Sequence, residues 1–401
     1  MKILQINSVA GIGSTGRIAT SIDSLLKSHG HESYLAYGRD SQNVSTPSIR
    51  IGSNFDVYRH IAITRIFDKH GFSSKKTTKS FIKEIIEIDP DVIHLHNIHG
   101  YYINVEILFD YLKKSNTPVV WTLHDSWAFT GHCSHFEYSG CECWQGETKC
   151  IQKKSYPKSL IFNNSLQNYQ RKKAAFTGVE NLTIVTPSNW LAKLVKESFL
   201  KEYPVQVINN GIDLTVFKPT KSTFREANKL TDKYLILGVA NVWGKKKGFD
   251  HFIELSKRLK QDEVIVLVGL SEKQKSELPS NIIGITQTNH VAELVDIYTS
   301  ADVYVNLTLE DTFPTTNLEA LACGTPVITF KTGGSVESID EACGYIVEQE
   351  DMNDLRDKLT QVKAKGKDSY FSNAVTKAER HYSDIDRFQD YIDLYENLLT
   401  K

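Results

Sequence analysis

The feature of this sequence that most constrains its fold is the alternation of short apolar runs with stretches of helical periodicity, which continues through most of the chain. The runs that resemble strands are KILQIN, SYLAY, DVIHLHN, PVVWTLHD, LTIVTPS, VQVINNG, YLILGVAN, VIVLVGL, NIIGIT, ADVYVNLT, TPVITF and GYIVE. Strands that alternate with helices predict parallel sheets covered by helices on both faces. The pattern therefore places the chain in the α/β class.

These runs are too many for one compact open sheet, and the series restarts at YLILGVAN after the charged segment KPTKSTFREANKLTDK. We therefore predict two doubly wound Rossmann-like domains, over residues 1–215 and 216–383, joined near residue 215. The last segment, 384–401, has helical apolar spacing and no strand-like run after it. Because ligands of open α/β sheets bind beyond the carboxyl ends of the strands, two such domains facing each other define a cleft lined by strand-end loops.

The composition predicts a soluble globular protein. The chain has 401 residues, 40% of them hydrophobic and 24% charged, with a net charge of -1 that gives no global attraction to nucleic acid. Local basic runs such as YQRKK and WGKKKG are expected to be solvated surface unless an anion binds them. The N-terminus looks like a first strand rather than a signal peptide, and no apolar run is long enough to span a membrane. We expect a cytoplasmic protein that reaches any membrane-bound substrate from the surface.

Four of the six cysteines crowd into one short segment, at Cys133, Cys141, Cys143 and Cys150. In a reducing compartment, clustered thiols favour zinc over disulfides. Their uneven spacing matches no common structural-zinc pattern, however, so a metal site and free buried thiols both stay open. The two isolated cysteines, Cys323 and Cys343, are expected to be core residues.

The segment AGIGSTGRI follows the first strand-like run and leads into a helical stretch. Gly11, Gly13 and Gly16 have the spacing of a dinucleotide-binding fingerprint, in which backbone N–H groups face phosphate. That fingerprint also needs an acid at the end of the second strand, where this chain has Gly38 and Arg39. The glycine spacing alone therefore leaves the ligand undecided.

Polar residues follow several predicted strands, at the sheet edge where ligands bind. They are His96 and Asn97, His124 and Asp125, Asn241, and Glu310 and Asp311. Downstream, TFPTTN begins a predicted helix that stops at Gly324, so the N–H groups of its first turn are available to an anion. Asp311 precedes this helix and Glu319 lies within it. Two carboxylates around a phosphate site suit a nucleotide sugar, although both are also ordinary acids near a helix start.

The order of the motifs along nearly the whole chain resembles that of family 4 glycosyltransferases. The motifs are STGRI, TLHD, TPSNWL, VINNGID, GKKKGFDHFI, LVGL, DIYTSADVYVN, DTFPTTNLEALACGTPVI and TGGSVESI. The resemblance implies the GT-B architecture, in which two Rossmann-like domains face each other across a cleft, and a retaining reaction. It also implies that the terminal helix packs back on the N-terminal domain. It is strongest toward bacterial transferases of capsular and exopolysaccharide synthesis.

The resemblance assigns roles to residues of this chain. It implies that His124, Asp311 and Lys247 are catalytic. It implies donor contacts at Gly13, Gly16, Asn241, Lys246, Lys247, Asp311, Phe313, Thr315, Thr316 and Glu319. We expect acceptor-side surface at Arg17, Asn97, His99, Tyr101 and Asp125. The GIGSTGRI turn is then the flexible N-domain loop of this family and not a dinucleotide fingerprint, and Gly333 and Gly334 form a similar loop in the second domain.

Three positions depart from the family's pattern. Asp311 stands where the first acid of the motif is usually Glu, and Pro314 stands where Gly is frequent. The position of the Arg that usually clamps the diphosphate falls in ANVWG, near Asn241 and Val242, so that charge is either omitted or supplied by Lys245 or Lys246. These departures leave the identity of the donor sugar open.

The resemblance implies transfer of a hexose or N-acetylhexosamine from a nucleotide sugar, with UDP-sugars expected from their frequency in the family. The implied acceptor is a lipid-linked oligosaccharide or another glycan, reached by peripheral contact with the inner membrane surface. We expect no cofactor and no catalytic metal, because the D-x-D triplets at Asp89 and Asp384 suit turn or cap positions. The alternatives are an epimerase or phosphorylase of the same fold and a non-catalytic nucleotide-sugar-binding subunit.

Overall fold

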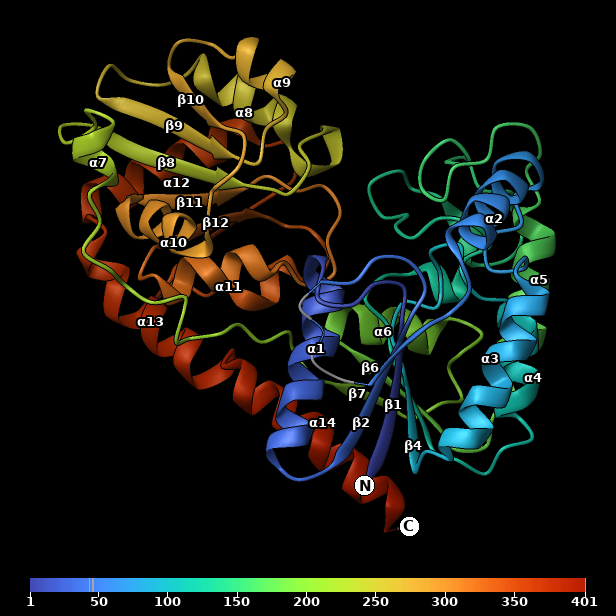
Figure 1. Cartoon of the computed structure of the whole chain (residues 1–401). Helices are drawn as coiled ribbons and strands as arrows, with labels where there is room; N and C mark the ends of the chain where they lie inside the picture. Colours follow the sequence, from blue (N-terminus) through green and yellow to red (C-terminus); the bar gives the residue numbers. More distant parts are fainter. Residues whose placement is uncertain (43, 45–46, 401) are drawn as a thin grey trace. The chain divides into compact units, whose positions relative to one another are not determined.

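The computed structural model describes residues 1–42, 44 and 47–400 and divides the chain into two compact units (Figure 1). Unit 1 consists of Met1–Asn209 together with Phe388–Lys401, and unit 2 of Asn210–Arg387. Each unit contains a parallel sheet with helical crossovers. The predicted pair of Rossmann-like α/β domains is therefore confirmed.

Among the described residues, unit 1 has a seven-stranded sheet in the order β3-β2-β1-β4-β5-β6-β7, with every neighbouring pair parallel. Its strands are β1 (Lys2–Asn7), β2 (Glu32–Tyr37), β3 (Ser48–Arg50), β4 (Val92–Leu95), β5 (Val119–Thr122), β6 (Leu182–Thr186) and β7 (Val205–Val207). Its helices are α1 (Gly13–Ser28), α2 (Asn54–Phe67), α3 (Lys75–Ile88), α4 (Val105–Leu112), α5 (Ser165–Phe176) and α6 (Asn189–Glu197), and most of α14 (Asp384–Leu399) also belongs to it. The edge strand β3 was not predicted, because it is short and its ends are exposed, which leaves no apolar run to detect.

Unit 2 has, over its described residues, a six-stranded parallel sheet in the order β10-β9-β8-β11-β12-β13. The strands are β8 (Tyr234–Val239), β9 (Glu263–Val268), β10 (Ile282–Ile285), β11 (Val303–Asn306), β12 (Val327–Phe330) and β13 (Gly344–Val347). The helices are α7 (Phe224–Ala227), α8 (Phe249–Ser256), α9 (Glu272–Ser276), α10 (Val291–Ser300), α11 (Thr315–Ala322), α12 (Met352–Lys365) and α13 (Asp368–His381). In both sheets the order reverses beside the first strand of the unit, and such a switch point is where α/β folds bind ligands.

The central strands of unit 1 are buried on both faces because helices cover both. Successive side chains of a strand point to opposite faces, so neighbouring residues join different cores. Leu4, Ile93 and Val119 pack with α3, α4 and α6, whereas Ile3, Val92 and Val120 pack with α1 and α14. This double burial explains why these strands appear in the sequence as continuous apolar runs rather than alternating ones.

The C-terminal helix α14 completes one face of the unit 1 sheet (Figure 1). Its buried Tyr391 and Tyr395 bring hydroxyl groups to the polar residues of the sheet: a 2.6 Å hydrogen bond joins Tyr395 Oη to His94 Nδ1, and Thr122 Oγ1 donates to Tyr391 Oη. His94 Nε2 also contacts Thr122 Oγ1 at 2.8 Å. Burial holds the pKa of His94 well below its usual range, so the imidazole is neutral.

Replacing Tyr395 with Phe should therefore destabilise unit 1. The substitution keeps the ring but leaves His94 Nδ1 without its partner in a buried site, which costs about 1–3 kcal/mol of unfolding free energy. The control is Tyr58→Phe in α2, where the side chain is 70% exposed and the change should stay within about 0.5 kcal/mol. Urea unfolding followed by tryptophan fluorescence measures both, and equal stabilities of the two variants would contradict the role of this hydrogen bond.

Candidate active site

The candidate site of unit 2 is a lysine turn clamped to the end of strand β11. The turn Lys245–Lys247 forms a short 3-10 helix, and the carbonyl oxygen of Lys246 accepts the backbone N–H of Leu309 at 2.8 Å. Gly248 follows with φ +77°, and a Cβ there would lie 2.3 Å from the carbonyl oxygen of Leu307. Only glycine combines this backbone conformation with such a close approach. The clamp therefore fixes where the lysines lie relative to the strand end.

Two lysine–carboxylate pairs connect this turn to the loop after β11. Lys247 Nζ lies 2.6 Å from Asp311 Oδ2, and Lys246 Nζ lies 2.5 Å from Glu310 Oε2. The Lys247 and Asp311 side chains keep 43% and 18% of their surface exposed, so solvent and ligand can reach this pair. Both predicted lysines thus lie beside the predicted acidic motif, although more than 60 residues separate them in the chain. An anion placed here would compete with the carboxylates for the two ammonium groups.

Helix α11 begins directly after this loop. Pro314 is its N-cap residue, and no side chain accepts a hydrogen bond from the first turn at that cap. Thr315 and Thr316 lie in this first turn and are half-buried. The N–H groups of an uncapped first turn and the positive end of the helix dipole suit a phosphate. The sequence predicted this helix, and the structure begins it at Thr315, within the TFPTTN segment.

Glu319 is held by a partner from a neighbouring helix. The hydroxyl of Tyr298, in α10, donates to Glu319 Oε2 at 2.9 Å. The buried Asn317 bonds to Asn306 and Ser338, which ties α11 to β11 and to the short helix Gly333–Ser338. Glu319 is therefore held in place by the core of unit 2. The ring of Phe313, by contrast, lies in the core near Tyr382, so what Phe313 presents to a donor is its backbone.

Asn241 and Val242 follow strand β8, and both side chains are exposed. Val242 is 78% exposed, which is unusual for an apolar side chain of this size. The neighbouring Trp243 is buried and donates to the carbonyl oxygen of Val268. The turn is thus anchored by Trp243, and its two preceding residues project toward solvent.

A separate candidate site of unit 1 lies at the ends of β4 and β5. A small pocket there is lined by His96, Asn97, His99, His124, Asp125 and Trp127, among others. His99 Nε2 lies 3.0 Å from Asp125 Oδ2, and the backbone N–H of Trp127 donates to Asp125 Oδ1 at 2.9 Å. A 3.2 Å hydrogen bond joins His96 Nδ1 to His124 Nε2. Four of the residues predicted on this side therefore line one pocket.

Burial sets the ionisation of this pocket. Burial lowers the pKa of His124 to about 4, so its imidazole is neutral at pH 7. Burial opposes ionisation of Asp125 as well, but the charge and the hydrogen bond of His99 outweigh it and lower the Asp125 pKa to about 2. The pocket therefore presents the Asp125 carboxylate and, at His124, a neutral imidazole, and both groups can exchange hydrogen bonds with hydroxyl groups.

An aromatic and histidine cluster continues from this pocket. The ring centroids of Tyr101 and His70 lie 4.5 Å apart, and Tyr156 Oη contacts His99 Nδ1 at 3.1 Å. The backbone of Tyr101 has φ +73°. A non-glycine residue in this backbone region is strained, which is common at functional sites. His70 and Tyr156 were not predicted, because neither follows a strand or belongs to a recognised motif.

Lys172 corrects one expectation. The run YQRKK was expected to be solvated surface, but Lys172 is buried in α5, with Nζ 3.4 Å from the centre of the Trp127 ring. It donates to the carbonyl oxygens of Trp127 and Thr130 at 2.6 and 3.0 Å, and burial lowers its pKa to about 7. In helix α5 the position of Lys172 faces the core, so the number of charges in the run did not predict that this lysine is buried.

The glycine turn lies at the end of β1, where α1 begins at Gly13. The backbone N–H of Gly11 donates to the carbonyl oxygen of Gly16, and a Cβ on Gly11 would lie 2.0 Å from the carbonyl oxygen of Gln42. Gly11 and Gly13 both have positive φ. Arg17 is exposed and its Nε donates to the carbonyl oxygen of Gly13. The turn thus has the tight geometry that lets backbone approach a ligand closely.

Comparison with known proteins identifies the family. The model of Glycosyltransferase Family 4 matches residues 16–216, and the model of Glycosyl transferases group 1 matches residues 220–378. The chain belongs to glycosyltransferase family 4. Its relatives include WcaC of Escherichia coli (strain K12), a glycosyl transferase provisionally assigned to colanic acid biosynthesis, at 23% identity over 99% of this chain and all of that protein. The predicted resemblance is confirmed.

Solved structures agree with this family. Sucrose-phosphate synthase from Thermosynechococcus elongatus superposes with a TM-score of 0.74 at 15% identity, covering the whole of both chains. Anabaena HepE in complex with UDP-glucose superposes with a TM-score of 0.68 at 12% identity, covering 99% of this chain and all of that one. The predicted GT-B architecture is confirmed. No helix in the described part of the chain has both the length and the apolar character needed to cross a membrane.

The histidine cluster makes a prediction for pH dependence. His60 is fully buried, and its ring centroid lies 6.0 Å from that of Tyr101. Its Nδ1 contacts Ser74 Oγ, and its Nε2 accepts a hydrogen bond from the backbone N–H of Gly71. Burial lowers its pKa to about 3, against about 6.5 in an unfolded chain. Below pH 6.5 His60 is therefore protonated in the unfolded state and neutral in the folded state, so the free energy of unfolding decreases as the pH falls.

We expect His60→Gln to weaken this dependence. The variant should be less stable than the parent at pH 7.5, because two hydrogen bonds are disturbed. The difference in unfolding free energy between the parent and the variant should then narrow by about 2 kcal/mol between pH 7 and pH 5, because the parent loses stability through His60 and glutamine does not titrate. Urea unfolding at pH 7.5, 6 and 5 measures this change. Parallel curves for the two proteins would show that His60 binds its proton equally well in the folded and the unfolded state, which would contradict the lowered pKa.

Proposed function

We propose that this glycosyltransferase moves a hexose or N-acetylhexosamine from a UDP-sugar to a lipid-linked oligosaccharide or another glycan acceptor, in the synthesis of a surface polysaccharide. The observation that carries the donor side of this proposal is the pair of lysine–carboxylate contacts at the start of α11. The match to WcaC over the full length of both chains supports a role in polysaccharide synthesis, as does the partial match to the capsular polysaccharide transferase CapM of Staphylococcus aureus.

The lysine turn suggests how the leaving group is stabilised. As the bond to the anomeric carbon breaks, negative charge grows on the diphosphate, and fixed cations with helix N–H groups stabilise it best. Lys247 is already held 2.6 Å from Asp311. A bound diphosphate would draw Lys247 away from this carboxylate. Asp311 would then accept a hydrogen bond from a hydroxyl group of the donor sugar. These groups supply the positive charge from the chain itself, and we propose that transfer needs neither a divalent metal nor another cofactor.

The nucleotide is assigned through Glu319 and through a structural neighbour. The Glu319 carboxylate, held by Tyr298, is suited to accept the two ribose hydroxyls. Anabaena HepE, whose fold this chain shares, was solved with UDP and with UDP-glucose. We therefore propose a UDP-sugar as the donor. We also propose retention of the anomeric configuration, which is the family's reaction and which the NMR coupling constant of the product's anomeric proton tests directly.

On the acceptor side we propose that Arg17, Asn97, His99, Tyr101 and Asp125 contact the glycan and that His124 bonds a hydroxyl of the transferred sugar. A neutral imidazole can donate one hydrogen bond and accept another, which suits a hydroxyl group during the transfer. Tyr101 adds an aromatic face beside His70. A pyranose ring has apolar C–H faces that pack on such rings.

A lipid-linked acceptor is supported by apolar side chains exposed on unit 1. Helix α2 exposes Phe55 and Tyr58, and the rings of Phe67 and Phe162 stack at 5.8 Å while both stay more than 40% exposed. The segments that carry these aromatic residues also hold exposed or half-buried cations, namely Arg59, Arg65, Lys69, Lys153, Lys154 and Lys158. Aromatic side chains among cations suit the headgroup region of an anionic membrane. We propose that this surface makes peripheral contact with the inner face of the membrane.

The nucleotide assignment predicts the effect of Glu319→Gln. Removing the charge should weaken UDP binding about tenfold or more, because a charge-assisted hydrogen bond is worth about 1.5–3 kcal/mol. Glu272→Gln, at an exposed carboxylate in α9, should leave the affinity unchanged. Calorimetric titration with UDP, GDP, ADP and NAD, without added metal, measures both the effect and the selectivity. Tighter binding of NAD than of UDP would overturn the donor assignment.

The catalytic assignment predicts a different pattern for His124→Ala. The rate of transfer should fall by about 100-fold or more, while the affinity for UDP-sugar stays within about twofold, because the proposed nucleotide contacts lie in unit 2. Release of UDP from UDP-hexoses, with synthetic polyprenyl-diphosphate-linked N-acetylhexosamine as acceptor, measures turnover. A wild-type rate in the variant would remove His124 from the mechanism. Donor binding by the parent protein without turnover on any acceptor would favour the alternative of a non-catalytic subunit.

A further inference from the structure

We propose that Cys133, Cys141, Cys143 and Cys150 bind one Zn²⁺ ion as a tetrahedral four-thiolate site. The four sulfur atoms all lie within 4.8 Å of one another. This site lies in unit 1, outside the groups assigned to glycosyl transfer, and it does not rest on the proposed function. Among the described residues these cysteines form the one group of three or more His, Cys, Asp and Glu side chains close enough to share a metal ion.

Two of the sulfur–sulfur distances lie close to those of a tetrahedral zinc site, and the others are within 4.8 Å. With zinc–sulfur bonds of about 2.3 Å, neighbouring sulfurs of a tetrahedron lie about 3.8 Å apart. Here Cys133 Sγ lies 3.5 Å from Cys143 Sγ, and Cys141 Sγ lies 3.7 Å from Cys150 Sγ. All four are free thiols, and these separations are contacts rather than bonds of about 2.05 Å. An ion at their centre needs only small shifts of the side chains.

The burial of the four thiols favours a metal over surface reactivity. Each cysteine is at most 2% exposed, so none is placed to react with an external oxidant. Independent core cysteines act as small apolar side chains and have no reason to converge on one point. Convergence of four sulfurs from one short segment is the arrangement that a soft divalent ion requires.

The segment that carries the cysteines needs such a cross-link. From residue 130 to 164, all of which the structure describes, the one regular element is the short 3-10 helix Glu142–Trp144. Long segments without regular structure are uncommon in compact domains and are costly to order. Four ligands spread along 133–150 would fix this segment at four points. The zinc site is therefore proposed to be structural, with all positions filled by protein.

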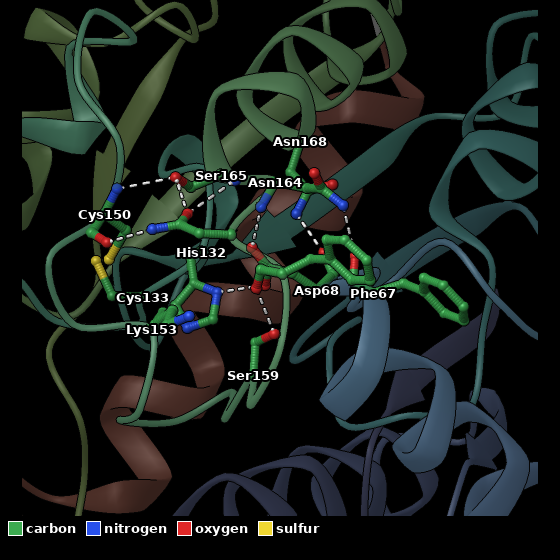
Figure 2. Close-up of polar contacts among 12 residues, drawn as sticks. Phe67, Asp68, His132, Cys133, Cys150, Lys153, Ser159, Asn164, Ser165 and Asn168 are labelled. Atoms are coloured by element: carbon green, nitrogen blue, oxygen red, sulfur yellow. Dashed lines mark hydrogen bonds and ion pairs between the residues drawn. The ribbon is translucent and has the colours of Figure 1, made fainter.

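Both ends of the segment are tied to Asp68, as Figure 2 shows. His132 Nδ1 lies 2.5 Å from Asp68 Oδ1, and the backbone N–H of Asn164 donates to Asp68 Oδ2 at 2.9 Å. The backbone N–H of Cys150 donates to Ser165 Oγ, at the start of α5. The ends of the segment are thus held by hydrogen bonds, and the proposed ion holds its middle.

The charge of the proposed site has a partner nearby. Zinc with four thiolates carries a net charge of −2, which is costly to bury without compensation. The ammonium of Lys172 donates to the carbonyl oxygen of Thr130, whose hydroxyl in turn donates to the carbonyl oxygen of Cys133. Lys172 is therefore connected through one residue, Thr130, to Cys133, the first of the proposed ligands.

The site would also support the unit 1 pocket. The backbone N–H of Ser126 donates to the carbonyl oxygen of Ser134, which places the residue after Asp125 in direct contact with the residue after Cys133. Fixing Cys133 therefore fixes the loop that presents Asp125 and Trp127. The proposed zinc acts on this pocket through the backbone and takes no part in the transfer reaction.

The test is the zinc content of the full-length protein, purified under reducing conditions without chelator and without a metal-affinity column. Mass spectrometry of the metal should find about one zinc per chain, and Cys133→Ser and Cys150→Ser should each reduce it to below about 0.1. The matched control is Cys323→Ala, which removes a buried cysteine of unit 2 and should leave the zinc content unchanged. Loss of zinc in this control as well would show that the metal binds elsewhere.

A second measurement covers the case in which the serine variants fail to fold. Parent protein expressed in cobalt medium should show the visible bands of tetrahedral Co²⁺ and the ultraviolet charge-transfer band of thiolate ligands. A mercurial titrant should release one metal for about four blocked thiols. Less than about 0.1 zinc per chain, an equivalent of iron in its place, or two disulfides in the purified protein would each overturn the proposal. UDP binding depends on the contacts proposed in unit 2. A protein that binds UDP but contains no zinc would therefore overturn the zinc site and leave the proposed function standing.

Discussion

The constraint on which the rest of this structure depends is that a parallel sheet must be buried on both faces. Helices cover the faces, so polar chemistry is displaced to the ends of the strands. In unit 1 the neighbouring residues Val119 and Val120 pack into two different cores, and the loop after the same strand carries His124 and Asp125. In unit 2, β11 ends in the loop that carries Glu310 and Asp311. The position of the candidate site follows from the way the sheets are buried.

The two units have candidate sites that differ in their electrostatics. The site of unit 2 holds partly exposed ammonium groups paired with carboxylates, and a phosphate can replace those carboxylates as the partner of the ammonium groups. The site of unit 1 holds buried groups: burial keeps His124 neutral, and the contact with His99 keeps Asp125 ionised. A nucleotide diphosphate suits the first environment, because its charge replaces that of the carboxylates. A neutral, hydroxyl-rich glycan suits the second, because it exchanges hydrogen bonds without bringing a charge that the pocket would have to bury.

Sequence reasoning reached those parts of the site that follow strands or belong to motifs. Lys247 and Asp311 were both predicted, and the structure brings them to 2.6 Å. His99 and Asp125 were predicted singly, but their pairing depends on how the loops after β4 and β5 fold. His70, Tyr156 and Lys172 were missed because their contacts join segments far apart in the chain, and local sequence carries no record of such contacts. The edge strand β3 was missed because an exposed three-residue strand has no apolar pattern.

The sequence by itself determined the fold class, the number of parallel sheets and the family, because apolar periodicity and motif order are local properties that repeat along the chain. The tertiary structure alone decided which polar side chains meet. The four cysteines illustrate the difference: their spacing of seven, one and six intervening residues matches no common zinc pattern, yet their sulfur atoms converge within 4.8 Å. Convergence depends on the path of an irregular segment that is tied at both ends to Asp68. Such a path is set by long-range hydrogen bonds and burial, which act only once the chain has folded.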